Sequence, residues 1–238
     1  MDYLLIHGSW HGAWCWHKIV PRLEVEGHRV MAPDLPGRIT NPALPVTVSL
    51  ARMVADLVRR LPKDRKTTVV VHSRYGVVAS ALCEACPERI ERVIYLASFM
   101  LPAGKRAASY FRSDRGSALG PHVSVSRLGM WDFLDPAIYR EGLYHDCAED
   151  DYHLARSLLV REPLRPALAR LDLTEARYGT VPRAYIRLTQ DRAVTPALQD
   201  RVLNETGAER VESIEASHSA YFSKPDELTA KILSMSRP

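Results

Sequence analysis

Residues 69–78 read VVVHSRYGVV, and this stretch joins a predicted strand directly to a predicted helix. Three consecutive valines are typical of a buried strand, and the pattern that begins at Gly76 is typical of a helix. A strand that runs through a short polar turn into a helix places Ser73 on a sharp turn, with its hydroxyl exposed above the sheet. The N-terminus of the helix points at the same spot, where its dipole and free N–H groups favour negative charge. The stretch therefore offers a nucleophile and a place for an oxyanion.

Similar short apolar runs occur along the rest of the chain. These predicted strands are residues 3–7, 28–32, 67–72, 92–97, 183–188 and 210–214. The runs lack clean alternation, as expected for strands that are covered on both faces of a parallel sheet. Helical patterns lie between most of them, at residues 16–26, 49–60, 76–86, 196–206 and 225–235. Alternating strands and helices predict an α/β fold with a mostly parallel, doubly wound sheet.

This alternation fails between about residues 104 and 179. The segment carries helical patterns at 150–160 and 166–171 and few strand signals. It is too long for a simple crossover between two strands. We therefore predict one α/β domain over residues 1–238, with residues 104–179 inserted as a helical cap. Such a cap would cover the carboxyl ends of the strands, where ligands bind in sheets of this kind.

Composition and charge narrow the function classes. The net charge of +4 comes from basic residues that are spread out, so nucleic acid is not an expected partner. No apolar stretch approaches the roughly 20 residues that a membrane span needs, and the N-terminal residues lack the features of a signal peptide. We therefore expect a cytoplasmic protein that acts on a small-molecule substrate without membrane contact. The sequence leaves open whether two copies of the chain form a homodimer.

Four cysteines are present, two of them, Cys83 and Cys86, at the spacing of a metal or redox pair. No second Cys or His pair lies at zinc spacing, so reduced structural thiols are the favoured interpretation. The chain also lacks a glycine-rich dinucleotide fingerprint and a P-loop. We therefore expect no cofactor and no metal.

Two further predicted strands end near residues that could serve a serine nucleophile. Asp191 follows the run at 183–188, and His218 follows the run at 210–214. The order Ser73, Asp191, His218 is the order of the triad in the α/β-hydrolase fold. His218 would take the Ser73 proton and later return it, and Asp191 would fix the imidazole tautomer and stabilise its cation.

The loop after the first predicted strand reads HGSWHG at residues 7–12. A glycine-bearing loop there can donate an N–H to an oxyanion, so the expected oxyanion hole consists of the Ser9 and Arg74 N–H groups. The expected substrate-binding residues are Gly8, Trp10, Arg74 and Trp131. The Arg74 guanidinium could hold a carboxylate or phenolate, although a solvent-directed or ion-paired side chain fits the sequence equally well. Plain core packing is the alternative for the tryptophans.

The turn itself departs from the usual signature, Gly-x-Ser-x-Gly. Val71 and Tyr75 occupy the two glycine positions, where a tight turn and close neighbouring backbone normally require glycine. On this motif alone, an ordinary strand-to-helix turn with an incidental serine fits the sequence about as well as a nucleophile turn does.

With these residues in view, the chain resembles the plant-type methylesterase and hydroxynitrile lyase group of α/β hydrolases, and bacterial esterases related to it. The resemblance covers nearly the whole chain and is carried by residues 7–8, 11–14, 33–37, 144–147, 181–186, 190–191 and 217–219. It implies the α/β-hydrolase fold. Lyases of the group carry a Lys directly after the catalytic His and a Thr in the first loop, where this chain has Ser219 and Gly8. These departures favour ester hydrolysis over cyanohydrin cleavage.

Three functions remain in competition. The first is a serine hydrolase that acts on a small carboxylic ester through an acyl-enzyme. The second is a lyase, decarboxylase or cyclase that uses His218 as a general base, an alternative motivated by Val71 and Tyr75 at the turn. The third is a non-catalytic binder of a small ligand, against which the intact set of Ser73, Asp191 and His218 weighs. The fold alone does not choose among them.

Overall fold

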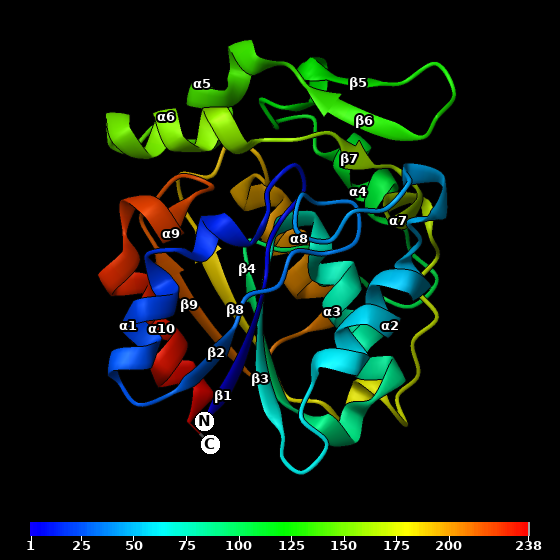
Figure 1. Cartoon of the computed structure of the whole chain (residues 1–238), viewed down its shortest axis with the longest axis vertical. Helices are drawn as coiled ribbons and strands as arrows, with labels where there is room; N and C mark the ends of the chain where they lie inside the picture. Colours follow the sequence, from blue (N-terminus) through cyan, green and yellow to red (C-terminus); the bar gives the residue numbers. More distant parts are fainter. Residues whose placement is uncertain (238) are drawn as a thin grey trace.

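Six parallel strands form the main sheet of the computed structural model, which describes residues 1–237 (Figure 1). In sheet order the strands are β2 (Arg29–Met31), β1 (Asp2–Ile6), β3 (Thr67–His72), β4 (Ile90–Leu96), β8 (Arg183–Leu188) and β9 (Arg210–Ile214). Every neighbouring pair in this sheet is parallel. All six predicted strands are therefore present, and the predicted doubly wound α/β sheet is confirmed.

Helices cover both faces of this sheet (Figure 1). The α-helices are α1 (Ile19–Val25), α2 (Leu50–Arg60), α3 (Gly76–Ala85), α4 (Ala107–Ser113), α5 (Tyr139–Leu143), α6 (Glu149–Leu158), α7 (Arg165–Leu168), α8 (Pro196–Thr206), α9 (Ala220–Ser223) and α10 (Pro225–Ser236). The short 3-10 turns are η1 (Ala13–Trp16), η2 (Pro45–Thr47), η3 (Ser73–Tyr75), η4 (Pro87–Arg89), η5 (Gly120–His122), η6 (Pro136–Ile138) and η7 (Tyr178–Thr180).

Strand β1 shows how the sheet builds two cores. Successive side chains of a strand point to opposite faces. Leu4 and Ile6 accordingly join the apolar cluster that includes side chains of α2, α3 and α8. Tyr3 and Leu5 join the second cluster, which includes side chains of α1 and α10. All four side chains are fully buried, which explains why the sequence of β1 lacks a polar face.

The first helix differs from the prediction in its length. We expected a helix over residues 16–26, but α1 begins at Ile19, and the residues before it form the separate turn η1. Pro21 explains the difference. Proline is tolerated in the first turn of a helix, where its missing N–H has no partner in any case, but not in the interior.

The segment between β4 and β8 lies over the carboxyl ends of the main strands (Figure 1). It contains the predicted helices, as α6 and α7, together with α4 and α5. It also contains a three-stranded sheet that the sequence did not predict, formed by the antiparallel strands β5 (Val123–Val125), β6 (Trp131–Leu134) and β7 (Glu162–Pro163). Strands of two to four residues are too short to produce a recognisable periodic pattern.

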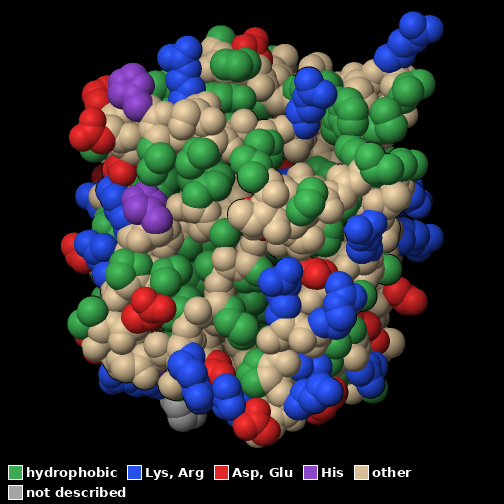
Figure 2. Space-filling view, viewed as in Figure 1, with side chains coloured by type: hydrophobic (Ala, Val, Ile, Leu, Met, Phe, Trp, Pro, Cys, Tyr) green, Lys and Arg blue, Asp and Glu red, His purple; other side chains and the backbone are tan. Residues whose placement is uncertain are grey.

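No helix in residues 1–237 is long and apolar enough to cross a bilayer. On the face seen in Figure 2, Lys and Arg side chains are interspersed with Asp and Glu side chains rather than gathered into one continuous patch. The cysteine pair lies at the end of α3, where both Cys83 and Cys86 are free thiols and buried. Burial raises the pKa of each thiol above its usual value, so both remain protonated at neutral pH.

Candidate active site

Ser73 lies at the sharp turn between β3 and α3 and has a backbone φ of +60°. This left-handed conformation is uncommon for a residue other than glycine and persists only where surrounding contacts fix it. Here the Ser73 carbonyl accepts hydrogen bonds from the Phe99 N–H at 3.0 Å and from the Ser98 hydroxyl at 2.6 Å. A strained serine at the end of a central parallel strand is the geometry of a nucleophile elbow.

Three strand ends bring the predicted triad residues together. His218 Nε2 lies 2.9 Å from Ser73 Oγ, and His218 Nδ1 lies 2.7 Å from Asp191 Oδ2. The other carboxylate oxygen, Asp191 Oδ1, accepts the N–H groups of Ala193 at 2.7 Å and Val194 at 2.9 Å. All three triad side chains are buried. The carboxylate is thus fixed by its own loop and in turn orients the imidazole toward the serine.

A second histidine, His72, supports the backbone of His218. His72 Nε2 lies 2.9 Å from the His218 carbonyl, and the two rings lie 4.3 Å apart between centroids. Burial holds the pKa of His72 well below its usual value, and the neighbouring His218 ring acts in the same direction. His72 therefore stays neutral and donates its Nε2 proton to the His218 carbonyl.

Gly8 brings the first loop against the elbow. A Cβ atom at this position would lie 2.9 Å from Ser73 Cβ and 2.9 Å from His72 Nδ1, closer than real Cβ contacts allow. Only glycine permits this approach. The next residue, Ser9, lines the small chamber in front of Ser73, as Arg74 does. The structure therefore places both residues of the expected oxyanion hole beside the nucleophile.

His11 fixes the Ser9 backbone. The His11 Nδ1–H donates to the Ser9 carbonyl at 2.7 Å, and His11 Nε2 accepts from the Tyr144 hydroxyl at 2.6 Å. Burial lowers the pKa of His11 to about 3, so the ring is neutral at physiological pH. A neutral ring can donate at one nitrogen and accept at the other, as this arrangement requires.

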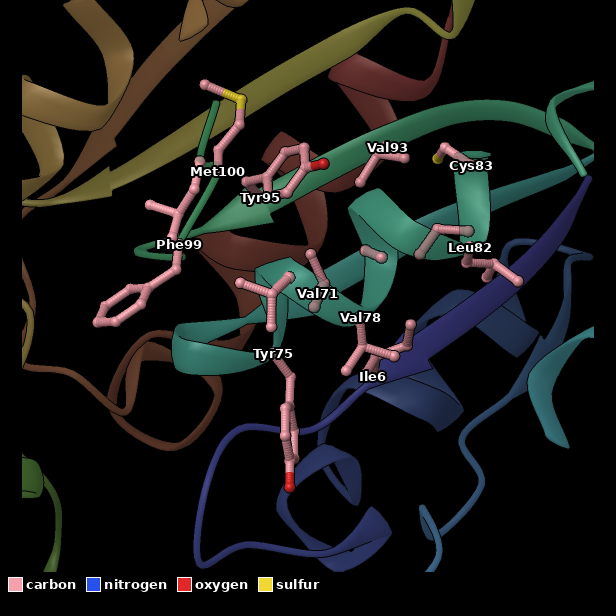
Figure 3. Close-up of a cluster of buried hydrophobic side chains, with 14 of the residues drawn as sticks. Ile6, Val71, Tyr75, Val78, Leu82, Cys83, Val93, Tyr95, Phe99 and Met100 are labelled. Atoms are coloured by element: carbon pink, nitrogen blue, oxygen red, sulfur yellow. The ribbon is translucent and has the colours of Figure 1, made fainter. Parts of the chain in front are cut away.

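The two unusual elbow residues lie outside the chamber. Both belong to the buried apolar cluster that includes side chains of α2, α3 and α8, and the Tyr75 ring has its hydroxyl at the far end (Figure 3). That hydroxyl donates a hydrogen bond to Glu162. The tight position falls instead at Gly76, where a Cβ would lie 2.6 Å from the Phe99 carbonyl oxygen. Neither Val71 nor Tyr75 lines the Ser73 chamber, so the elbow accommodates them without obstruction.

The Arg74 side chain is ion-paired, which settles the alternatives left by the sequence. Its Nη1 donates to Asp132 Oδ2 at 2.6 Å, and both side chains are buried. The guanidinium carbon lies 4.8 Å from the ring centre of Trp10 and 5.6 Å from that of Phe111. Arg74 is thus held by one charge and by two aromatic rings.

Trp10 is held at both ends by carboxylates from the β6–β7 pair. Its indole N–H donates to Asp132 Oδ1 at 2.7 Å, and its backbone N–H donates to Glu162 Oε2 at 2.6 Å. Trp10 has a φ of +61°, a conformation that these two hydrogen bonds help to fix. Glu162 Oε2 also accepts from Arg38 Nη2 at 2.5 Å. Both carboxylates therefore act on the residue that directly follows Ser9.

Comparison with known proteins identifies the family of this chain. A sequence profile described as the alpha/beta hydrolase family matches residues 3–231. The chain belongs to this family. Two Arabidopsis thaliana relatives are putative methylesterase 14, chloroplastic, with 31% identity over 99% of this chain and 72% of the relative, and methylesterase 1, with 29% identity over 95% and 92%. The crystal structure of polyneuridine aldehyde esterase superimposes with a TM-score of 0.89 at 27% identity, over 99% of both chains.

These relatives support an ester hydrolase, and some similar proteins carry other names. Norfluorocurarine synthase 2 from a Strychnos species is 30% identical over 95% of this hydrolase and 91% of its own length. Tomato methylketone synthase I, in a complex with 2-tridecanone, has a TM-score of 0.84 at 25% identity, over 98% of this chain and 96% of its own. The family therefore establishes the fold, and the similar proteins include esterases as well as synthases.

Of the expected substrate-binding residues, only Trp131 lies away from the elbow and its chamber. Trp131 and Asp132 are neighbours on β6 and point to opposite faces of it. Asp132 reaches Arg74, whereas Trp131 lines a separate outer groove of about 900 Å³, where the Arg161 guanidinium lies 5.2 Å from its ring. The structure therefore brings Gly8, Trp10 and Arg74 to the elbow of the hydrolase, but not Trp131.

Sequence reasoning missed Asp132, Glu162 and Arg38, although each is buried beside the site. The available signal was an acidic residue flanked by apolar ones, as Asp132 is by Trp131 and Phe133. A carboxylate in such a setting is buried only when it is paired. The signal nevertheless does not identify the partner, which lies far away in the sequence.

Proposed function

We propose that this α/β hydrolase is a serine esterase that cleaves a small carboxylic ester through an acyl-enzyme on Ser73. The observation that carries the proposal is the position of His218, with one ring nitrogen 2.9 Å from Ser73 Oγ and the other 2.7 Å from Asp191 Oδ2. A base between an alcohol nucleophile and an orienting carboxylate is the arrangement that activates serine for attack on a carbonyl.

In the first half of the reaction, Ser73 Oγ attacks the ester carbonyl carbon while its proton moves to His218 Nε2. The developing oxyanion lies within reach of the Ser9 and Arg74 N–H groups, and these provide its stabilisation. His218 then donates the same proton to the leaving alkoxide, so the alcohol departs neutral and the acyl group remains on Ser73. Asp191 stabilises the imidazolium throughout and stays ionised.

In the second half, a water molecule gives its proton to His218 and its oxygen to the acyl carbon. The C–O bond to Ser73 breaks, and the proton returns from His218 to Ser73 Oγ. The products are a carboxylic acid and the alcohol released earlier. Every step uses this chain's own residues and water.

A small ester is favoured by the room available. The chamber in front of Ser73 has a volume of only about 10 Å³, so it leaves no room for a bulky group beside the nucleophile. Several relatives are named methylesterases, a name that refers to methyl esters. A methyl ester, or an ester with a similarly short group on one side, is the substrate class that fits both observations.

The competing function is a non-hydrolytic reaction in which His218 acts as a base without an acyl-enzyme. It is supported by the relatives whose names are those of synthases. The replaced elbow glycines support this reaction only weakly, because neither Val71 nor Tyr75 lines the chamber and His218 Nε2 still contacts Ser73 Oγ.

Steady-state hydrolysis of p-nitrophenyl acetate and of methyl esters by Ser73→Ala and His218→Ala separates these functions. The esterase predicts that either change lowers kcat by at least about a thousandfold. A base-only catalyst would keep its own activity in Ser73→Ala and lose it in His218→Ala. A pure binder would show ligand-dependent thermal stabilisation without turnover in the wild type. Ser223→Ala, at a position outside the chamber, serves as the matched control.

A further inference from the structure

Two cavities meet at the Arg74 side chain. One is the chamber in front of Ser73, and the other, here called the vestibule, has a volume of about 270 Å³. Arg74 and Phe111 line both cavities, and no other described residue does. These two side chains are therefore the wall between the nucleophile and the vestibule.

The Arg74 half of this wall is firmly held. Its guanidinium is bound to Asp132 and lies against the rings of Trp10 and Phe111. Asp132 is itself bound by the Trp10 indole, so the three side chains contact one another in a closed triangle. Separating a buried guanidinium from its carboxylate leaves an uncompensated charge, which is strongly unfavourable. Thermal motion alone will therefore seldom move Arg74 out of the wall.

The vestibule suits an apolar group. Its charged lining residues are the mutually paired Arg74 and Asp132, together with Arg112, whose side chain is exposed. The other lining residues are small or apolar: Ala108, Phe111, Gly120, Val123, Val125, Leu164, Ala167 and Leu168. A cavity with such walls binds alkyl or aryl groups by burying them from water.

The larger outer groove beside Trp131 does not compete for this role. It is lined by residues of β6, α5 and the loop before α2, and it shares no lining residue with the Ser73 chamber. The vestibule, by contrast, shares the Arg74 and Phe111 side chains with that chamber.

We propose that Arg74, held by Asp132, is the specificity-determining residue of this esterase. Its side chain limits the group beside Ser73 to a few atoms and keeps the vestibule closed to the ester. Shortening it would join the two cavities and admit esters with longer alkyl chains. This inference rests on the proposed function of Ser73 and adds the size limit of the substrate to it.

The test compares p-nitrophenyl acetate with p-nitrophenyl octanoate in the variant R74A/D132N. The paired change avoids an unpaired buried carboxylate and keeps an oxygen acceptor for the Trp10 indole. The ratio of kcat/KM for octanoate to that for acetate is expected to rise by about tenfold or more, because the longer chain gains an apolar cavity. An unchanged ratio in the folded, active variant would overturn the proposal.

One single variant is the matched control. R161A removes an arginine from the outer groove and leaves Arg74 and Asp132 paired. It is expected to keep the wild-type ratio within about twofold, since it does not shorten the wall. If R161A rather than R74A/D132N changed the ratio, the alkyl chain would occupy the outer groove, and the assignment of Arg74 would be wrong.

A binding measurement separates this proposal from the proposed function. Thermal stabilisation by 2-decanone and by 2-butanone, ketones that resemble long and short esters but cannot be hydrolysed, needs no nucleophile. R74A/D132N should gain stabilisation by 2-decanone relative to the wild type, and equal stabilisation in both proteins would contradict the role of Arg74. Absence of ester hydrolysis in the wild type, combined with this gain, would overturn the esterase but keep the size limit.

Discussion

Asp132 and Glu162 lie opposite each other across the β6–β7 strand pair, and each accepts one hydrogen bond from Trp10. The small sheet above the main strands thereby fixes the loop that carries Ser9. Each carboxylate is also paired with an arginine, Asp132 with Arg74 and Glu162 with Arg38. These two buried ion pairs connect the segment above the sheet to the elbow and to the loop after β2, from which Arg38 also donates a hydrogen bond to the His11 carbonyl of the first loop.

Glu162→Gln should lower the free energy of unfolding by about 3 kcal/mol, because it leaves the Arg38 guanidinium buried without its carboxylate. Urea unfolding measures this change. Glu149→Gln is the matched control, since Glu149 pairs with Arg140 at the surface and should contribute less than about 1 kcal/mol. Equal effects of the two changes on the free energy of unfolding would show that the buried ion pair contributes no more to stability than the surface pair.

Gly8→Ala should reduce esterase activity by at least about tenfold, because its Cβ would press on Ser73 and displace the nucleophile or the first loop. Gly120→Ala is a suitable control, since a Cβ there meets no atom within 4 Å. Kinetics on p-nitrophenyl acetate with both variants test the point. Wild-type activity in Gly8→Ala would mean that the loop tolerates the contact.

The double change Val71→Gly with Tyr75→Gly restores the usual elbow motif, yet it should not raise ester hydrolysis. Neither side chain lines the chamber, and both are buried. Removing them should instead lower stability by more than about 3 kcal/mol, through lost apolar contacts and a lost hydrogen bond to Glu162. Activity per folded molecule and thermal unfolding are the measurements. A clear rise in activity would show that these residues suppress the nucleophile.

Acid should destabilise the fold through its buried histidines. Burial lowers the pKa of His7 and of His11 to about 3, below the value near 6.5 of an unfolded chain. Between these values the unfolded state binds protons that the folded state does not, so the free energy of unfolding falls as pH falls. Each histidine should contribute about 1 kcal/mol of this loss between pH 7 and pH 5.5.

Urea unfolding at several pH values measures that loss. His11→Gln should flatten the pH dependence by about the contribution of one histidine, whereas the exposed His17→Gln should leave the slope unchanged. A slope that is the same in wild type and His11→Gln would contradict a neutral, buried His11.

Much of the fold could be predicted from the sequence because local signals and topology agree. Strands β3, β8 and β9 occupy the predicted residues. In β3 the three consecutive valines are typical of a strand covered on both faces. The positions of Ser73, Asp191 and His218 then followed from topology. The carboxyl ends of parallel strands meet at one edge of the sheet, so residues just beyond them converge.

The wall around the nucleophile could not be predicted in the same way. Whether Arg74 binds a ligand or an ion-pair partner depends on Asp132, which lies 58 residues later in the chain. The orientation of Trp131 depends on the register of a four-residue strand, in which a shift of one residue exchanges the two faces. Long-range pairing of this kind leaves no pattern in a single sequence.

The most direct test of the account is the intact mass of the protein after treatment with a serine-directed fluorophosphonate, with Ser73→Ala as the control. The account predicts a single adduct on the wild type and none on the variant, because the contact with His218 makes Ser73 an activated nucleophile. A folded wild-type protein that gains no adduct, or a Ser73→Ala variant that gains the same one, would contradict it.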